Sequence, residues 1–343
     1  MATASDLPRY EIVDFGLLET DSSKAIAINN AGQVLGKFTD RGQPHIFLWD
    51  SKSGLKILEL PNDSSCLKLN NNGQIAGVHG GGKKVFFWDP ATGFFDIGSF
   101  DDKYKRVDEF NDKAQILFSS LDHSHESREY YNGKDCPIFL WDQGFVINLA
   151  EEFYLQQSKD WLFFSSTAMN GNGDIAFFAI PSSAPATYKS FLWRSGQFDE
   201  IFLDKSPSGY VRIVHKLDDE ENMIIISLRP SGNRYDFAGD VNWFINPKKR
   251  IKFIISDWYH AIAIKNGFPF SIGSLPYRLK QMQDGQMYLK PGALIQSLVK
   301  LGLPFERERP DGVIDQNSSG YVIGTAFTVY REEHAFLAIP VSQ

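Results

Sequence analysis

The chain has 343 residues, of which 43% are hydrophobic, 14% aromatic and 22% charged. This composition is that of an ordinary folded protein and excludes wholesale disorder and collagen-like structure. The 35 Lys and Arg residues against 42 Asp and Glu residues give a net charge of -7, which disfavours sequence-independent nucleic-acid binding, and two cysteines cannot form a disulfide framework.

The N-terminal stretch MATASDLPR has no basic region followed by an apolar one, so no signal peptide is expected. No stretch approaches about 18 consecutive apolar residues, so no membrane span is expected. Two localisations stay open, the cytoplasm and export by a signal-independent route.

Internal repeats begin close to the N-terminus. Residues 25–50 and 66–89 each contain an alternating segment, an N-x-x-G-Q turn, a second apolar segment and an aromatic F-x-W-D segment. Asn and Gly tolerate the positive φ that tight turns need, so each turn predicts a β-hairpin. Each repeat therefore predicts four short strands.

The repeat continues, with decay, to the C-terminus. The equivalent turn positions are Asn29, Asn70, Asn111, Asn170, Asp218 and Asn317. The last interval is about twice a repeat, so one degenerate copy is expected between Asp218 and Asn317. Two positions for its turn stay open, near Lys265 or near Met282.

Four-stranded units at this spacing are typical of β-propellers, because one such sheet cannot bury both faces alone. The sequence predicts an all-β, single-domain, seven-bladed propeller over residues 1–343, with six blades as the alternative. Residues 10–17 predict the fourth strand of the last blade, which would close the ring. Residues 291–303, with Pro at the start and apolar residues at helical spacing, predict a short helical insertion.

The segments AIAINNAGQVLG and HIFLW, together with HAFL at 334–337, resemble the HAF-type repeat of proteins often labelled as probable extracellular repeat proteins. The resemblance is strong over residues 10–118 and 134–194, and it returns at 315–340. It implies a β-propeller-like fold and carries no catalytic motif. It also suggests a bacterial exported protein, such as an effector or a scaffold.

The longest connections fall at one face of the predicted propeller. They are residues 119–137, 151–167, 180–189 and 229–240, whereas the N-x-x-G turns opposite are short. Insertions in repeat proteins usually mark the binding face. Neutral variation in surface loops is the alternative explanation.

Several side chains in these insertions are types that protein interfaces favour. The candidate partner-binding residues are His123, His125, Arg128, Tyr130, Tyr131, Trp161, Arg234 and Tyr235. The aromatic residues of 151–167 have packing within the blades as an equal alternative. His123 and His125 lack a third ligand at metal-site spacing, so no metal is expected.

Other motifs favour structure over chemistry. Residues 77–83 match G-x-x-x-x-G-K, but Lys84 stands where a phosphate-binding loop needs Ser or Thr, and no helix follows. Four tryptophans recur at one strand position and predict packing between blades: Trp49, Trp88, Trp141 and Trp193. No cofactor and no catalytic residue is assigned.

The sequence therefore predicts a monomeric, non-enzymatic module that binds another protein through the insertion-bearing face. The alternative is a glycan-active enzyme or lectin that uses the channel mouth. Convergence of His123, His125, Glu126 and Asp236 would favour the enzyme, because catalysis needs ionisable groups within reach of one point.

Overall fold

A computed structural model describes the greater part of the chain. The described residues are 9–18, 22–121, 137–157, 161–181, 189–201, 211–220, 223–231, 234–245, 249–254, 261–265, 268–272, 277–281, 287–291, 313–327 and 333–341. Within these ranges the chain forms antiparallel strands, one α-helix and one short 3-10 helix. It divides into two compact units, the first comprising residues 1–62, 259–263 and 270–343, and the second comprising 63–258 and 264–269.

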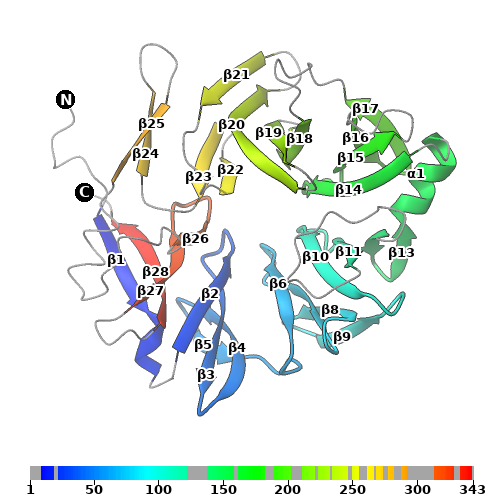
Figure 1. Ribbon diagram of the computed structural model, residues 1–343. Helices are drawn as coiled ribbons and strands as arrows, with labels where there is room; N and C mark the ends of the chain where they lie inside the picture. The colour runs from blue at the N-terminus through cyan, green and yellow to red at the C-terminus, as the bar shows by residue number, and fades with distance from the viewer. Residues whose placement is uncertain are drawn as a thin grey trace. The chain divides into compact units, whose positions relative to one another are not determined.

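The second unit contains four consecutive four-stranded sheets (Figure 1). In every one of them the strands pair in chain order. The sheets are β6 (Ser65–Leu69), β7 (Ile75–His79), β8 (Lys84–Asp89) and β9 (Gly93–Gly98); β10 (Tyr104–Phe110), β11 (Ile116–Leu121), β12 (Ile138–Asp142) and β13 (Phe145–Asn148); β14 (Trp161–Met169), β15 (Ile175–Pro181), β16 (Lys189–Arg194) and β17 (Gln197–Ile201); and β18 (Val211–Leu217), β19 (Met223–Ser231), β20 (Arg234–Ile245) and β21 (Lys249–Ile254).

The first unit contains two four-stranded sheets. One is formed by β2 (Ser22–Ile28), β3 (Val34–Asp40), β4 (Gln43–Asp50) and β5 (Gly54–Ile57). The other has the order β1-β28-β27-β26, from β1 (Arg9–Asp14), β28 (Glu333–Val341), β27 (Val322–Phe327) and β26 (Val313–Gln316). The N-terminal strand thus completes the C-terminal sheet, as the sequence predicts.

The prediction of one closed propeller with seven four-stranded blades is wrong. In the described residues six sheets have four strands, and two sheets have only two. The two-stranded sheets are β22 (Ala261–Lys265) with β23 (Phe268–Ile272), and β24 (Tyr277–Gln281) with β25 (Met287–Pro291). These segments are the two candidate positions of the degenerate repeat, and neither is followed by an F-x-W segment that would supply a third strand. Beyond Pro291, which ends β25, the predicted helix at 291–303 lies outside the described residues.

The asparagine of each predicted turn is buried and organises its hairpin. Asn70 is 4% exposed, its Oδ1 accepts the backbone N–H of Gln74 (3.0 Å), and its Nδ2 donates to Gln74 Oε1 (2.7 Å). The bond from the backbone N–H four residues later recurs at Asn29, Asn111, Asn170 and Asn317. The side chain therefore closes the turn from inside, where a buried polar group needs partners.

The same asparagines also join neighbouring sheets of the second unit. Asn70 Nδ2 donates to the carbonyl oxygen of Asn111 (3.0 Å), and Asn111 Nδ2 donates to that of Asn170 (3.2 Å). Asn170 Nδ2 continues the series to the carbonyl oxygen of Asp218 (3.1 Å). This asparagine ladder places the four turns next to one another. In the first unit Asn317 Nδ2 makes the equivalent bond to the carbonyl oxygen of Asn29 (3.0 Å).

The four recurring tryptophans are buried or partly buried. Trp88, Trp141 and Trp193 are 5%, 7% and 6% exposed. The Trp141 ring lies 5.5 Å from the ring of Phe87 on the preceding sheet. Trp49 is partly buried and packs on Phe15, with ring centroids 5.7 Å apart. These contacts bury apolar surface between sheets, which is the main stabilising term for such units.

Candidate functional site

The insertions of the second unit leave its sheets at one common end. In the β10–β13 sheet, residues 122–136 connect the end of β11 to the start of β12. The equivalent connections in the next two sheets are 182–188 and 232–233. Since the asparagine ladder holds the opposite ends of these sheets together, the three connections emerge on the same side. We call this side the insertion end and the ladder side the turn end.

Five of the predicted partner-binding residues lie outside the described residues. They are His123, His125, Arg128, Tyr130 and Tyr131, all within the connection 122–136. Glu126, which the enzymatic alternative needs beside them, lies in the same connection. Their assignment to an interface stays a prediction.

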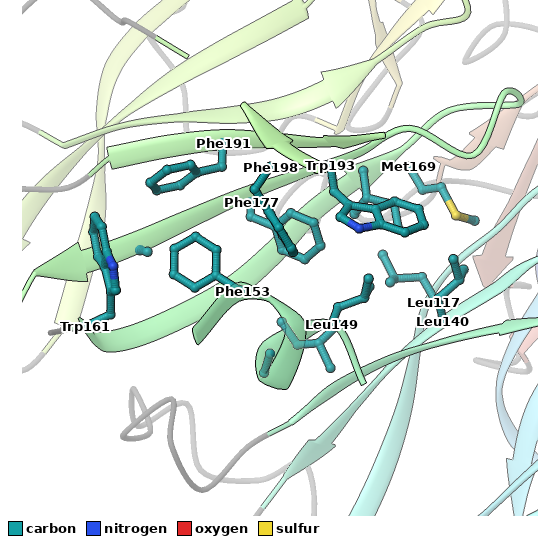
Figure 2. Close-up of a cluster of buried hydrophobic side chains, with 14 residues drawn as sticks. Leu117, Leu140, Leu149, Phe153, Trp161, Met169, Phe177, Phe191, Trp193 and Phe198 are labelled. Atoms are coloured by element: carbon teal, nitrogen blue, oxygen red, sulfur yellow. The ribbon is translucent and has the colours of Figure 1, made fainter. Parts of the chain in front are cut away.

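Trp161 begins β14 and lies in the core, where the sequence left packing as an alternative. Its side chain is 7% exposed and its ring is perpendicular to that of Phe191, with centroids 5.4 Å apart (Figure 2). Phe153 completes this cluster from α1 (Leu149–Gln157), 5.4 Å from the Trp161 ring. The indole Nε1 donates to the carbonyl oxygen of Gln157 (3.2 Å). Trp161 therefore supports the insertion end from inside.

The helix α1 fills part of the connection 151–167 and packs along the outer strand of the next sheet. Gln156 Nε2 donates to the carbonyl oxygen of Gly196 (2.7 Å) beside β17. At its N-terminus Asn148 Oδ1 accepts the backbone N–H of Glu151 (3.2 Å), a typical N-cap bond. The helix thus packs between the β10–β13 sheet and the β14–β17 sheet.

The predicted loop 229–240 is a hairpin. Strands β19 and β20 continue to their tip, where Ser231 pairs with Arg234 and Pro230 with Tyr235. Only residues 232–233 connect them. Arg234 and Tyr235 are therefore at the insertion end of the β18–β21 sheet, where β20 begins.

An ion pair between a buried lysine and a half-buried aspartate lies where the connection 122–136 leaves its sheet. Lys105 on β10 is 0% exposed, and its Nζ contacts the Asp101 carboxylate and the carbonyl oxygen of Lys103 (2.7 Å). Asp101 Oδ2 accepts the hydroxyl of Ser120 on β11 (2.8 Å). Burial acts to raise the pKa of Asp101, but the hydrogen bonds from Lys105, Ser120 and Lys103 outweigh it and hold the pKa below its ordinary value.

The glycine-rich turn 80–82 joins this end from the neighbouring sheet. Gly80, Gly81 and Gly82 all have positive φ, and the turn connects two strands, β7 and β8. The Gly81 N–H donates to Asp63 Oδ2 (2.6 Å), so this amide is already hydrogen-bonded to a carboxylate of the same chain. The arrangement lacks the following helix that a phosphate-binding loop uses, in agreement with the sequence.

A second charged group, on β7 to β9, is linked by Asp96. The carboxylate lies 3.1 Å from Lys84 Nζ and 3.4 Å from His79 Nε2. Burial acts to raise the pKa of Asp96, whereas its bonds to Lys84 and His79 prevail and lower it. His79 packs between Phe86 and Phe94, with ring centroids 6.0 and 5.4 Å away. The imidazole is thus packed against side chains of β8 and β9.

The described residues contain no group of three or more His, Cys, Asp or Glu side chains that could hold a metal ion. The carboxylates that follow two tryptophans are engaged in the repeat: Asp89 Oδ2 accepts Gln74 Nε2 and Asp142 Oδ2 accepts Gln115 Nε2, both at 2.9 Å. The hydrogen bond from Gln74 lowers the pKa of Asp89. Across the same parts of the chain, no helix has the length and apolar character needed to cross a membrane.

Sequence reasoning missed Lys105 and the ladder. Lys105 and Val107 alternate on β10 and are both buried, so the period-2 pattern placed Lys105 on the inner face. Because the segment KYKR is rich in cationic residues, which are usually exposed, its alternation does not by itself indicate that Lys105 is buried. The ladder was hidden because the turn asparagines were assigned only to local hairpin geometry.

Comparison with known proteins supports the fold. No protein-family model and no curated protein sequence matches the chain, so the resemblance to the HAF-type repeat stays a prediction. A catalytically inactive virginiamycin B lyase from Staphylococcus aureus with quinupristin is 12% identical, with a TM-score of 0.54 over 97% of this chain and 100% of that chain. A streptogramin B lyase is 12% identical, with a TM-score of 0.51 over 95% and 97%.

The similarity extends to part of a larger enzyme. An acylaminoacyl peptidase from Pyrococcus horikoshii is 12% identical, with a TM-score of 0.52 over 95% of this chain and 53% of that chain. At such identities the similarity shows the fold alone, since one fold supports many functions. The chain has an all-β, propeller-like fold.

Proposed function

We propose that the protein is a non-enzymatic module that binds another protein through the insertion end of its second unit. The observation that carries the proposal is the asymmetry between the two ends of the sheets. The turn end is closed by short hairpins that bond to one another, whereas the two long connections, 122–136 and 182–188, emerge at the insertion end. Loops on a rigid scaffold are where repeat proteins place their contacts.

The chemistry of the described insertion end favours binding over catalysis. Lys105 and Ser120 are buried and bonded to Asp101, and Gly81 is bonded to Asp63. Polar groups used in this way hold the scaffold. The side chains of 122–136 include the two tyrosines and the arginine that interfaces favour.

The test is a replacement of residues 122–136 by a Gly-Ser linker of equal length. The replacement begins after β11, because Ser120 is buried and its removal would damage the sheet. Quantitative mass spectrometry of proteins that co-purify with the full chain should show specific partners lost from the replaced variant.

The matched control is Ala91→Lys, an exposed position in the turn between β8 and β9, at the turn end. Both variants should retain the circular dichroism of the unaltered protein. Partners retained by the replaced variant, or lost from Ala91→Lys, would refute the proposal.

A further inference from the structure

We call the two ends of the connection 122–136, at Ser120 and Pro137, its root. One buried cation lies beside this root. Among the residues whose burial the structure describes, Lys105 is the one charged side chain that is buried, and its exposure is 0%. Three acceptors surround its Nζ: the carboxylate of Asp101, the carbonyl oxygen of Lys103 (2.7 Å) and the carbonyl oxygen of Asp101 (3.4 Å). An ammonium has three protons, so its hydrogen-bonding capacity is filled. It has no proton or lone pair to offer to a ligand.

The partner carboxylate brings the neighbouring segments together. Asp101 Oδ1 also accepts the backbone N–H of Lys103 (2.8 Å), which curls the connection between β9 and β10. Its Oδ2 holds the hydroxyl of Ser120, which is itself 0% exposed. The connection between sheets and the end of β11 are thus tied to the same carboxylate.

Backbone bonds extend this node to two further segments. Lys105 pairs directly with Ser120 across the sheet, and its backbone N–H donates to the carbonyl oxygen of Gly82 (2.7 Å) in the turn of the neighbouring sheet. The Ser120 N–H donates to the carbonyl oxygen of Pro137 (2.9 Å), the first described residue after the connection. Both stems of the connection therefore meet at the ion pair.

We infer that Lys105 is a positioning residue for the proposed interface, acting with Asp101 and Ser120 to fix where the connection 122–136 leaves the sheet. The inference rests on the proposed function, because the position of the root matters to a partner only if the connection binds one. The ion pair is a costly way to stabilise a sheet, since an apolar pair of similar volume is often as stable. Its directed bonds do, however, fix the geometry of three segments: the connection between β9 and β10, β10 itself and the end of β11.

The experiment measures amide hydrogen exchange in the full chain. In Lys105→Met and in Asp101→Asn, the amides of residues 105 and 120 should exchange at least about tenfold faster, because the side-chain bonds that hold this part of the backbone in place are removed. Amides of β15 and β19, in other sheets of the same unit, should exchange at unchanged rates. Ser120→Ala, which removes one bond and keeps the ion pair, should give a smaller local increase.

Lys189→Met is the control, because Lys189 makes a surface ion pair with Glu200 (2.9 Å) and is 43% exposed. This change should leave every exchange rate close to its original value. Equal acceleration in all sheets of Lys105→Met and of Ser120→Ala, or no acceleration at the root in any variant, would overturn the inference.

Partner binding separates this inference from the proposed function. Loss of partners in Ser120→Ala, together with local acceleration at the root, supports both. If the root loosens and the linker replacement of 122–136 retains every partner, the proposed function fails and with it the assignment of Lys105 to an interface. If the replacement loses the partners and the loosened variants retain them, only the inference about Lys105 fails.

Discussion

At the scale of single residues, the turn asparagine is the unit from which the sheets are assembled. Asn170 is 3% exposed and makes both a bond within its turn and a bond to the next sheet. Asn172, two residues later in the same turn, is exposed, and its side-chain Nδ2 donates to the carbonyl oxygen of Asp219 (3.1 Å). Comparing these two positions therefore distinguishes the stability contributed by a buried side-chain hydrogen bond from that of an exposed one.

We expect Asn170→Ala to lower the free energy of unfolding by about 2 kcal/mol, because buried backbone groups lose their partners. Asn172→Ala, its matched control, should lower it by roughly 0.5 kcal/mol, since water replaces the lost partner. Urea denaturation followed by circular dichroism measures both values. Equal losses in the two variants would show that the ladder contributes no more than a surface turn.

Asp101 gives the protein a specific acid sensitivity. Its pKa in the folded protein is below the ordinary value, chiefly because bonds from Lys105 and Ser120 outweigh burial. A lowered carboxyl pKa contributes stability that is complete above the ordinary Asp pKa of about 3.9 and is lost as the pH falls through the folded value.

Asp101→Asn should therefore lose less free energy of unfolding than the unaltered protein between about pH 5 and about pH 2. Urea titrations across this range measure the difference, and Asp89 and Asp96 contribute equally to both proteins. Parallel curves would contradict the assignment of this sensitivity to Asp101.

At the scale of elements, the N-terminal strand is held in place by more than its ladder with β28. His334 Nδ1 lies 3.2 Å from both carboxylate oxygens of Asp14, and the Gly16 N–H donates to Asp14 Oδ1 (2.8 Å). A Cβ at Gly16 would lie 2.0 Å from His334 Nδ1. The glycine is thus required for the imidazole to sit over the chain after β1.

Gly16→Ala should lower the free energy of unfolding by about 1–3 kcal/mol, the usual cost of overpacking. Adding His334→Ala should make the loss smaller than the sum of the two single losses, because the clash disappears. Thermal unfolding of the four proteins gives the coupling. Additive losses would show that the imidazole does not press on this glycine.

The sequence predicts some elements and not others, because local turn chemistry and alternation can be recognised in the sequence whereas sheet completion cannot. The N-x-x-G turns, the aromatic strands and the pairing of β1 with β28 follow from local turn chemistry and period-2 alternation. The region from β22 to β25 was assigned a whole blade because the interval between turns suggested one, but its strands pair only two by two. Spacing alone does not supply the aromatic third strand that a sheet needs.

The candidate site was predicted less well than the fold. The location of the insertions follows from repeat length, whereas burial depends on contacts between distant segments. The sequence predicts either partner binding or packing for Trp161 and does not choose between them; in the structure Phe153 and Phe191 enclose it. The sequence does not predict the role of Lys105, because its partners Asp101 and Gly82 come from connections whose conformation the sequence pattern does not give.

At the scale of the whole molecule, one cooperative domain over residues 1–343 stays a prediction. Strand β1 is in the same compact unit as the C-terminal sheet, so that unit is built from both ends of the sequence. Differential scanning calorimetry should show one unfolding transition. Two resolved transitions, one for each compact unit, would contradict it.

The most direct test of a binding surface at the insertion end uses two positions of the β14–β17 sheet. Lys189 begins β16 at the insertion end and Gln197 begins β17 at the turn end, and both are exposed. A photoreactive amino acid placed at each, in turn, samples proteins bound at that end. The account predicts a discrete cross-linked partner from position 189 that disappears when 122–136 is replaced, and none from position 197. Cross-links from position 197 alone, or equally from both, would contradict it.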